Sequence, residues 1–226
     1  MIKNYLQQNA NIDLTEHMQT QLKIYCDFLL QENEKYNLTS ITDVEQVYIK
    51  HFADSILGSA AISKNAKLCD VGSGAGFPSV PLKIARPDID ITLVDSLEKR
   101  INFTKTLCGK LQISAEFYHA RAEDFAAAHR EQFDVATARA VAALPILLEY
   151  VAQIVKIDGI VLAYKTDESE TETAVNACKI LGLKFEKTYN FTLPDGSKRC
   201  LIAFRKVKQT PIKYPRGQNK PRKQPL

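Results

Sequence analysis

The chain has 226 residues, of which 45% are apolar and 25% are charged, a composition typical of a globular protein that buries its own core. The most apolar stretch, residues 141–164, is interrupted by Pro145, Glu149, Lys156 and Asp158, so we expect no membrane span, and the polar first residues predict no secretory signal. Five scattered cysteines without C-x-x-C spacing predict core thiols in a cytoplasmic protein, with neither disulfides nor a metal site.

The first 62 residues predict a helical extension. Apolar side chains recur at helical spacing over residues 14–34, with Asp13 or Thr15 as the residue that caps the helix start. The same spacing returns over residues 43–62. Residues 1–62 therefore form the first predicted region.

From residue 63 the pattern changes to short apolar runs that alternate with helical segments, which is typical of βαβ units on a parallel sheet. The last two runs flank Pro194-Asp195-Gly196-Ser197, a turn signal that predicts an antiparallel hairpin at one sheet edge. The sequence thus predicts an α/β, Rossmann-like core over residues 63–204, with a mostly parallel sheet of seven strands. The predicted strands are Lys67–Val71, Ile89–Asp95, Ala115–His119, Phe133–Ala138, Ile157–Tyr164, Lys184–Phe191 and Arg199–Phe204.

Residues 205–226 differ in charge from the rest of the chain. They hold eight Lys or Arg residues and no acid, whereas the other 204 residues hold 22 basic and 26 acidic side chains. Four prolines and a glycine lie among these cations. The sequence predicts a basic tail that is flexible until it binds a polyanion.

Residues 68–78 carry glycines, Gly72 and Gly74 among them, where a buried strand ends and a helix begins. Glycines there let the backbone turn sharply and approach a ligand closely. The pattern is D-x-G-x-G-x-G, and the third glycine of a dinucleotide fingerprint would fall at Phe77, which disfavours a pyrophosphate site. A tight loop that carries Asp70 suits a ligand with a cationic amine and no phosphate, such as S-adenosylmethionine. A glycine-rich turn without a ligand is the alternative.

Three further strand ends supply candidate ligand groups. Asp95 ends the second strand, where a carboxylate accepts from ribose hydroxyls, or else it caps a helix over residues 96–109. After the third strand, Ala122 and Glu123 fit adenine, and acids in the first turn of a short helix are the alternative. After the fourth, the fork-shaped cation of Arg139 suits a methionyl carboxylate or an RNA phosphate, with a surface arginine as the alternative.

Together these segments resemble the RsmG/GidB family over nearly the whole chain. The glycine loop alone would indicate only some class I methyltransferase, whereas the set of motifs is far more specific. The motifs are Lys35-Tyr36-Asn37-Leu38-Thr39-Ser40-Ile41, Lys50-His51-Phe52-Ala53-Asp54-Ser55-Ile56, Asp70 to Pro78, Asp95-Ser96 with Lys99-Arg100, Arg121-Ala122-Glu123, Thr137-Ala138-Arg139-Ala140-Val141, Tyr214-Pro215-Arg216 and Pro225-Leu226.

The resemblance implies a class I fold and S-adenosylmethionine-dependent methylation of guanine N7 in the decoding region of bacterial 16S rRNA. It places Gly72, Phe77, Ala122, Glu123 and Arg139 at the cofactor, and Gly74 and Asp95 join them by the reasoning above. The sequence departs from the family at Ser79 and at Thr166, where glycine is common. Ser79 is expected to narrow the loop.

The implied chemistry needs no general base, because guanine N7 carries a lone pair and no proton. We therefore name no catalytic residue, and His51 is interpreted as a structural residue or an RNA contact. Arg139, Lys165, Arg199 and Arg216 are candidate contacts to RNA phosphates, with solvated surface cations as the alternative. The predicted partner is 16S rRNA or the small ribosomal subunit, bound by a monomer that needs no metal.

Two other functions stay open at this point. A class I methyltransferase of another RNA or of a small molecule would explain the core motifs, although a small-molecule enzyme would leave the basic tail unused. A non-catalytic RNA-binding assembly factor that kept the fold would explain the tail, but it would not bind S-adenosylmethionine.

Overall fold

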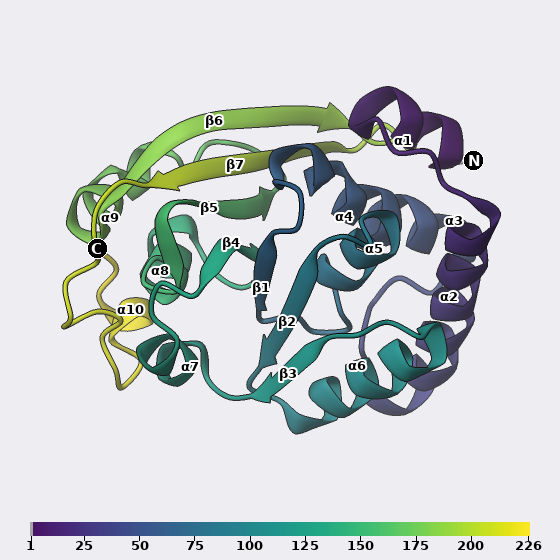
Figure 1. Ribbon diagram of the computed structural model, residues 1–226, viewed down its shortest axis with the longest axis horizontal. Helices are drawn as coiled ribbons and strands as arrows, with labels where there is room; N and C mark the ends of the chain where they lie inside the picture. The colour runs from purple at the N-terminus through teal and green to yellow at the C-terminus, as the bar shows by residue number, and fades with distance from the viewer. Residues whose placement is uncertain (1) are drawn as a thin grey trace.

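A computed structural model describes residues 2–226, with one seven-stranded sheet in its middle and helices on both faces (Figure 1). The strand order is β3-β2-β1-β4-β5-β7-β6; β1 to β5 are parallel, and β7 runs antiparallel to both β5 and β6. The predicted α/β fold with a C-terminal hairpin is confirmed. The strands are β1 Lys67–Val71, β2 Asp90–Asp95, β3 Glu116–His119, β4 Phe133–Arg139, β5 Val155–Lys165, β6 Leu183–Thr192 and β7 Lys198–Lys206.

The strand positions follow from the apolar runs of the sequence, because central strands are buried on both sides. In β1, every residue after Lys67 is buried, and in β2 every residue after Asp90. Each strand boundary lies within two residues of its predicted place. The hairpin turn over residues 193–197 is closed by a hydrogen bond from the Leu193 N–H to the Ser197 carbonyl (2.9 Å).

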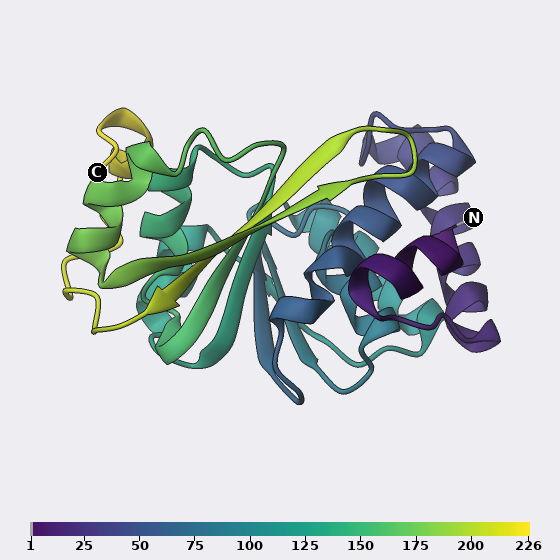
Figure 2. The same cartoon turned by 90° about the horizontal axis from the view of Figure 1, so that it is seen from above.

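The N-terminal region packs on one face of the sheet, together with α5 and α6 (Figure 2). Thr15 caps α2 by accepting a hydrogen bond from the Met18 N–H (3.3 Å). Helix α1 was not expected, because only Ile2, Leu6 and Ala10, one residue per turn, are buried in it. The helical segments are α1 Ile2–Ala10, α2 Glu16–Tyr36, α3 Val44–Val47, a π-helical turn Tyr48–Ala53, α4 Asp54–Ile56, a 3-10 turn Leu57–Ala61, α5 Ser79–Ala85 and α6 Glu98–Leu111.

The opposite face is covered by three short helices and by the C-terminal segment, residues 207–226 (Figure 1). These elements are α7 Ala122–Ala128, α8 Leu144–Val151, a 3-10 turn Glu172–Ala174, α9 Val175–Leu181 and α10 Lys220–Lys223. A second apolar cluster fills the space between them and the sheet. Within residues 2–226, no helix combines the length and apolar character that a membrane crossing requires.

The basic tail is packed against the body, which its composition did not predict. Strand β7 continues to Lys206, beyond the expected boundary at residue 204. Thr210 and Tyr214 are buried, and their carbonyl groups accept hydrogen bonds from the Arg130 guanidinium (2.5 and 2.9 Å). These anchors lie far away in the sequence, so local composition gives no sign of them.

The five cysteines are free and buried, as predicted. Burial raises the pKa of Cys26 to about 11 and that of Cys108 to about 12. The thiols therefore stay protonated and act as small core side chains.

Candidate active site

A cavity of about 390 Å³ opens at the carboxyl ends of β1 to β4, where the strand order reverses between β1 and β4. Small-molecule sites in proteins have volumes of roughly 300–1,000 Å³, and open α/β sheets bind ligands at this place. The structure brings all seven residues predicted for the cofactor into its wall. They are Gly72, Gly74, Phe77, Asp95, Ala122, Glu123 and Arg139.

The glycine loop between β1 and α5 forms the floor of the cavity. Gly72 and Gly74 have φ of +76° and +57°, the left-handed region that side chains disfavour. A Cβ at Gly72 would lie 2.6 Å from Val141, whereas a Cβ at Gly74 would meet nothing closer than the Gly72 carbonyl at 4.0 Å. The loop is tightly packed at its first glycine and open to the cavity at its second.

Asp70 lies beneath this loop and is absent from the cavity wall, which differs from its expected role toward a cationic amine. One of its oxygens accepts hydrogen bonds from the Ser79 N–H (3.2 Å) and the Ser79 hydroxyl (2.7 Å). Burial raises the pKa of Asp70 to about 7, although the Ser79 bonds lower it. Because the Ser79 side chain is turned toward Asp70, it does not narrow the cavity.

Asp95 holds the loop in place. Its two carboxylate oxygens accept hydrogen bonds from the N–H groups of Gly74 and Leu97, each 2.9 Å long. Arg100 Nη1 lies 3.5 Å from one oxygen of the same carboxylate. Helix α6 begins at Glu98 after Leu97, so the alternative that Asp95 is the capping residue is wrong.

Ala122 and Glu123 begin α7, so the acids do lie in the first turn of a short helix. The same two residues line the cavity. The two interpretations from the sequence therefore do not compete, because the helix start presents these groups to the site.

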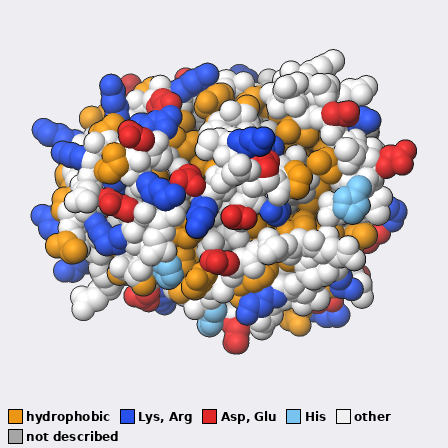
Figure 3. All heavy atoms as spheres, viewed as in Figure 1, with side chains coloured by type: hydrophobic (Ala, Val, Ile, Leu, Met, Phe, Trp, Pro, Cys, Tyr) orange, Lys and Arg blue, Asp and Glu red, His pale blue; other side chains and the backbone are white. Residues whose placement is uncertain are grey.

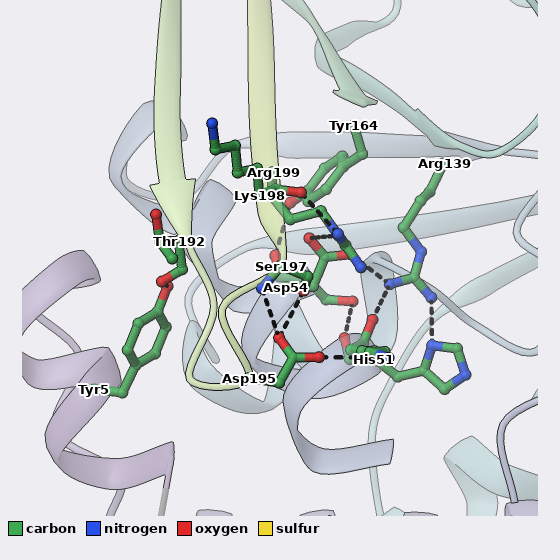
Figure 4. A network of polar contacts seen from close by, with 12 residues as sticks. Tyr5, His51, Asp54, Arg139, Tyr164, Thr192, Asp195, Ser197, Lys198 and Arg199 are labelled. Carbon is green, nitrogen blue, oxygen red and sulfur yellow. Dashed lines mark hydrogen bonds and ion pairs between the residues drawn. The ribbon is translucent and has the colours of Figure 1, made fainter. Parts of the chain in front are cut away.

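Arg139 leaves the end of β4 and is held by the π-helical turn (Figure 4). Its Nη1 donates to Asp54 Oδ2 (2.9 Å) and to the Lys50 carbonyl (3.1 Å), and its Nη2 donates to His51 Nδ1 (3.1 Å). The guanidinium carbon lies 4.8 Å from the centre of the Phe77 ring. π-Helical turns are rare and often occur at functional sites. This one supplies Lys50 and His51 as partners of Arg139, and Asp54 follows it directly as the first residue of α4.

Asp54 joins Arg139 to the β6–β7 hairpin (Figure 4). Its second oxygen lies 3.4 Å from Arg199 Nε, and the hairpin residue Asp195 pairs with Lys50 at 3.4 Å. Burial raises the pKa of Asp54, while Arg139 and Arg199 lower it. Sequence reasoning gave Asp54 no role, although a lone acid inside the apolar helical run of residues 52–57 was an available signal.

His51 lies between Arg139 and Thr39, with its ring stacked on Phe77 at 4.4 Å between centroids. A guanidinium only donates, so Nδ1 of His51 accepts and the ring proton belongs on Nε2, which donates to Thr39 Oγ1 (2.8 Å). Burial and the neighbouring Arg139 lower the pKa of His51 to about 3. A neutral ring with both nitrogens engaged fits the predicted structural role.

The structure does not gather Lys165, Arg199 and Arg216, the other predicted RNA contacts, with Arg139 at the cavity. Each forms an internal ion pair, Lys165 with Glu170 (2.9 Å), Arg199 with Asp54 and Arg216 with Glu149 (2.6 Å). Their role toward RNA remains a prediction. Other Lys and Arg side chains are spread over the face seen in Figure 3, many of them toward the end that carries α9 and the C-terminal segment.

Several residues in the cavity wall were missed from the sequence. They come from both ends of the chain: Leu38, Thr39 and His51 precede the sheet, and Asn219 and Arg222 follow it. Thr39 and His51 stand in motifs that carried the family resemblance, which was an available signal. Asn219 and Arg222 had none beyond the charge of the tail.

Comparison with known sequences places the chain among ribosomal RNA methyltransferases. A model of the family described as rRNA small subunit methyltransferase G matches residues 18–199. Proteins named ribosomal RNA small subunit methyltransferase G are similar over nearly their whole length. The one from Lysinibacillus sphaericus is 47% identical over 97% of this chain and 95% of its own length. The one from Streptococcus gordonii is 44% identical over 98% and 97%.

Solved structures of distant sequence share the fold. The 1,6-didemethyltoxoflavin-N1-methyltransferase of Burkholderia thailandensis, crystallised with S-adenosylhomocysteine, has a TM-score of 0.57 at 13% identity and covers 83% of this chain and 89% of its own. The precorrin-6y C5,15-methyltransferase of Geobacter metallireducens has a TM-score of 0.51 at 13% identity and covers 76% and 92%. At this identity the likeness concerns the fold alone.

Proposed function

The chain belongs to the rRNA small subunit methyltransferase G family, and from this membership we propose that it methylates N7 of a guanine in 16S rRNA with S-adenosylmethionine. The observation that carries the proposal is the meeting of the seven predicted cofactor residues in one cavity at the tips of β1 to β4. The competing idea of a non-catalytic assembly factor gives no reason for such a preformed cavity.

The groups in the cavity fit an adenosine ligand with a methionyl part. Asp95 and Glu123 both line the cavity, and Glu123 lies in the first turn of α7. We expect Asp95 to accept from the ribose hydroxyls and Glu123 to accept from an adenine amine. Ser73 lines the cavity, and its buried hydroxyl has no hydrogen-bond partner within residues 2–226, so a ligand group would satisfy it. Gly74 leaves the space above the loop free.

The residues around Arg139 then align the reactants. S-adenosylmethionine bound in the cavity would supply a sulfonium methyl group that is transferable to the lone pair of guanine N7, with the neutral thioether as the leaving group. The neutral His51 ring accepts from Arg139 and donates to Thr39, so it does not act as a base. The methylated base keeps the positive charge, and no proton has to leave. Catalysis rests on alignment and exclusion of water.

RNA phosphates would meet the protein through cations around the cavity mouth and on the C-terminal segment. Arg100 lines the cavity, and the C-terminal segment has no acid to offset its charge. Such contacts give affinity and orientation but little base selection, so we propose that the shape of the rRNA selects the guanine.

The cofactor site is tested by Gly74→Asn. Asparagine tolerates positive φ, and its side chain would occupy the open space above the loop. We expect a loss of S-adenosylmethionine binding of at least about 100-fold in calorimetry with an unchanged melting temperature. Gly196→Asn is the matched control, because Gly196 also has positive φ (+82°) and open space around it but lies in the hairpin turn. Equal affinities of both variants would refute the site.

The substrate is tested in cells that lack the gene. Their 16S rRNA is reduced with borohydride and cleaved with aniline, which breaks the chain at 7-methylguanosine. We expect the cleavage product to disappear and to return when the gene is restored. Persistent cleavage would contradict the proposed target, and a purified protein that binds the cofactor but methylates no rRNA would favour another substrate.

A further inference from the structure

The C-terminal segment, residues 207–226, reaches the proposed cofactor cavity from the opposite side to the N-terminal region. It is anchored by Glu149, which is fully buried on α8. Both carboxylate oxygens of Glu149 accept from the Arg216 guanidinium (2.8 and 2.6 Å), and one also accepts from the Arg216 N–H (2.9 Å). A buried carboxylate held in this way requires its partner, because an unpaired buried charge is costly.

The anchor determines where the next residues lie. Arg216 Nη2 also donates to the Gln224 carbonyl (2.7 Å), which closes the loop that contains α10. Leu226 packs against the apolar cluster beneath α8. Held at both ends, the loop brings Asn219 and Arg222 into the cavity wall.

Arg222 lines the cavity together with Val141, Tyr150 and Glu123. Burial raises the pKa of Tyr150, Glu123 raises it further, and Arg222 lowers it. Arg222 Nη2 reaches the Val141 carbonyl only at 3.4 Å, the long end of a hydrogen bond. A guanidinium has five N–H donors, and this contact engages one of them.

We propose that the C-terminal segment completes the cofactor site and that Arg222 contacts the bound nucleoside on the side of the cavity formed by Val141, Tyr150 and Glu123. A guanidinium there stacks on the face of a heteroaromatic ring or donates to its nitrogen atoms. The inference rests on the proposed cofactor site and adds a residue to it. It also gives the C-terminal segment a second use, because α10 carries Arg222, which lines the cavity, and Lys220 and Lys223, which do not.

The test compares Arg222→Ala with Lys223→Ala. Both changes remove one cation from α10, but Lys223 does not line the cavity. We expect Arg222→Ala to raise the dissociation constant for S-adenosylmethionine about tenfold and to raise the KM for the cofactor similarly. Its kcat at saturating cofactor and its melting temperature should stay close to those of the parent. Lys223→Ala should change the cofactor constants by less than about twofold. Arg222→Lys, which keeps the charge but loses the planar fork, should lie between them.

The outcomes separate this inference from the proposed function. If the parent protein fails to bind S-adenosylmethionine, the proposed function is wrong and the inference falls with it. If the parent binds but Arg222→Ala and Lys223→Ala have the same cofactor affinity, only the inference is wrong. A loss of rRNA affinity in Arg222→Ala without any change in cofactor binding would equally overturn it, and would assign this arginine to the RNA.

Discussion

The two regions that flank the sheet are attached to it by different interactions. Residues 2–62 and 207–226 pack on opposite faces of the sheet, and each supplies residues to the wall of one cavity. The N-terminal region is held by an extensive apolar core, whereas the C-terminal segment is held by one buried ion pair, carbonyl hydrogen bonds and a few buried side chains. Apolar attachment leaves a periodic trace in the sequence, and polar attachment leaves none.

The largest effect is expected in the apolar attachment. Phe52 is fully buried, and its ring lies 5.1 Å from those of Tyr25 and Tyr48. Phe52→Ala should cost about 3–5 kcal/mol of unfolding free energy, measured by urea denaturation, because a cavity remains where the ring was. Val44→Ala, at a side chain that is 53% exposed in the same region, is the control and should cost under about 1 kcal/mol. Similar costs for both would contradict the comparison.

The polar attachment is broken by Arg216→Ala. The change leaves the carboxylate of Glu149 without its cation. For a completely buried ion pair, the removal of one partner costs about 3–5 kcal/mol of unfolding free energy. We expect about 2–3 kcal/mol, because Arg216 is itself partly exposed and the released segment lets water reach Glu149. Faster proteolysis after residue 206 should accompany the loss. Lys213→Ala, which removes an exposed cation of the same segment, should change neither measurement, and an intact, protease-resistant Arg216→Ala would show that the ion pair is not the anchor.

The smallest effect concerns pH and belongs to the N-terminal region. The pKa of His51 is lowered to about 3 by burial and Arg139, whereas an unfolded chain takes up this proton near pH 6.5. The unfolded state therefore binds more protons than the folded state below about pH 6.5. The contribution of His51 to the free energy of unfolding decreases as the pH is lowered. At pH 5 the cost is about 2 kcal/mol relative to pH 7.5.

The measurement compares the pH dependence of unfolding in the parent and in His51→Gln. Asp70 acts in the opposite direction, because its raised pKa of about 7 lets the folded state bind the extra proton as the pH falls. Both proteins share Asp70, so the difference between their slopes isolates His51. Parallel slopes between pH 7.5 and 5 would mean that the folded state protonates His51 as readily as the unfolded chain does.

The fold was predictable from the sequence to within small shifts of each strand. Buried parallel strands are continuous apolar runs, and turn residues mark their ends, so the pattern is local. Helix α1 was not predicted, because a single apolar residue per turn is too weak a pattern. The packing of the C-terminal segment was not predicted, because its anchors, Arg130 and Glu149, precede it by many residues.

The site residues that lie at the ends of parallel strands could be predicted from the sequence. Gly72, Gly74, Asp95 and Arg139 lie at strand ends, and the carboxyl ends of parallel strands meet at one edge of the sheet. Asp70 was misplaced because sequence alone does not tell which side of a loop a side chain takes, and Ser79 decides it here. The network of Asp54, Arg199 and Lys50 depends on how the hairpin meets the π-helical turn.

The buried cysteines make it possible to label the C-terminal segment at a single site and to measure its mobility. All five thiols are shielded, and the raised pKa of each side chain disfavours the thiolate, which is the nucleophile that attacks a maleimide. A fluorophore can therefore be attached to Lys213→Cys alone, in a chain that keeps its native cysteines. Its anisotropy would follow in real time whether the C-terminal segment is clamped or free.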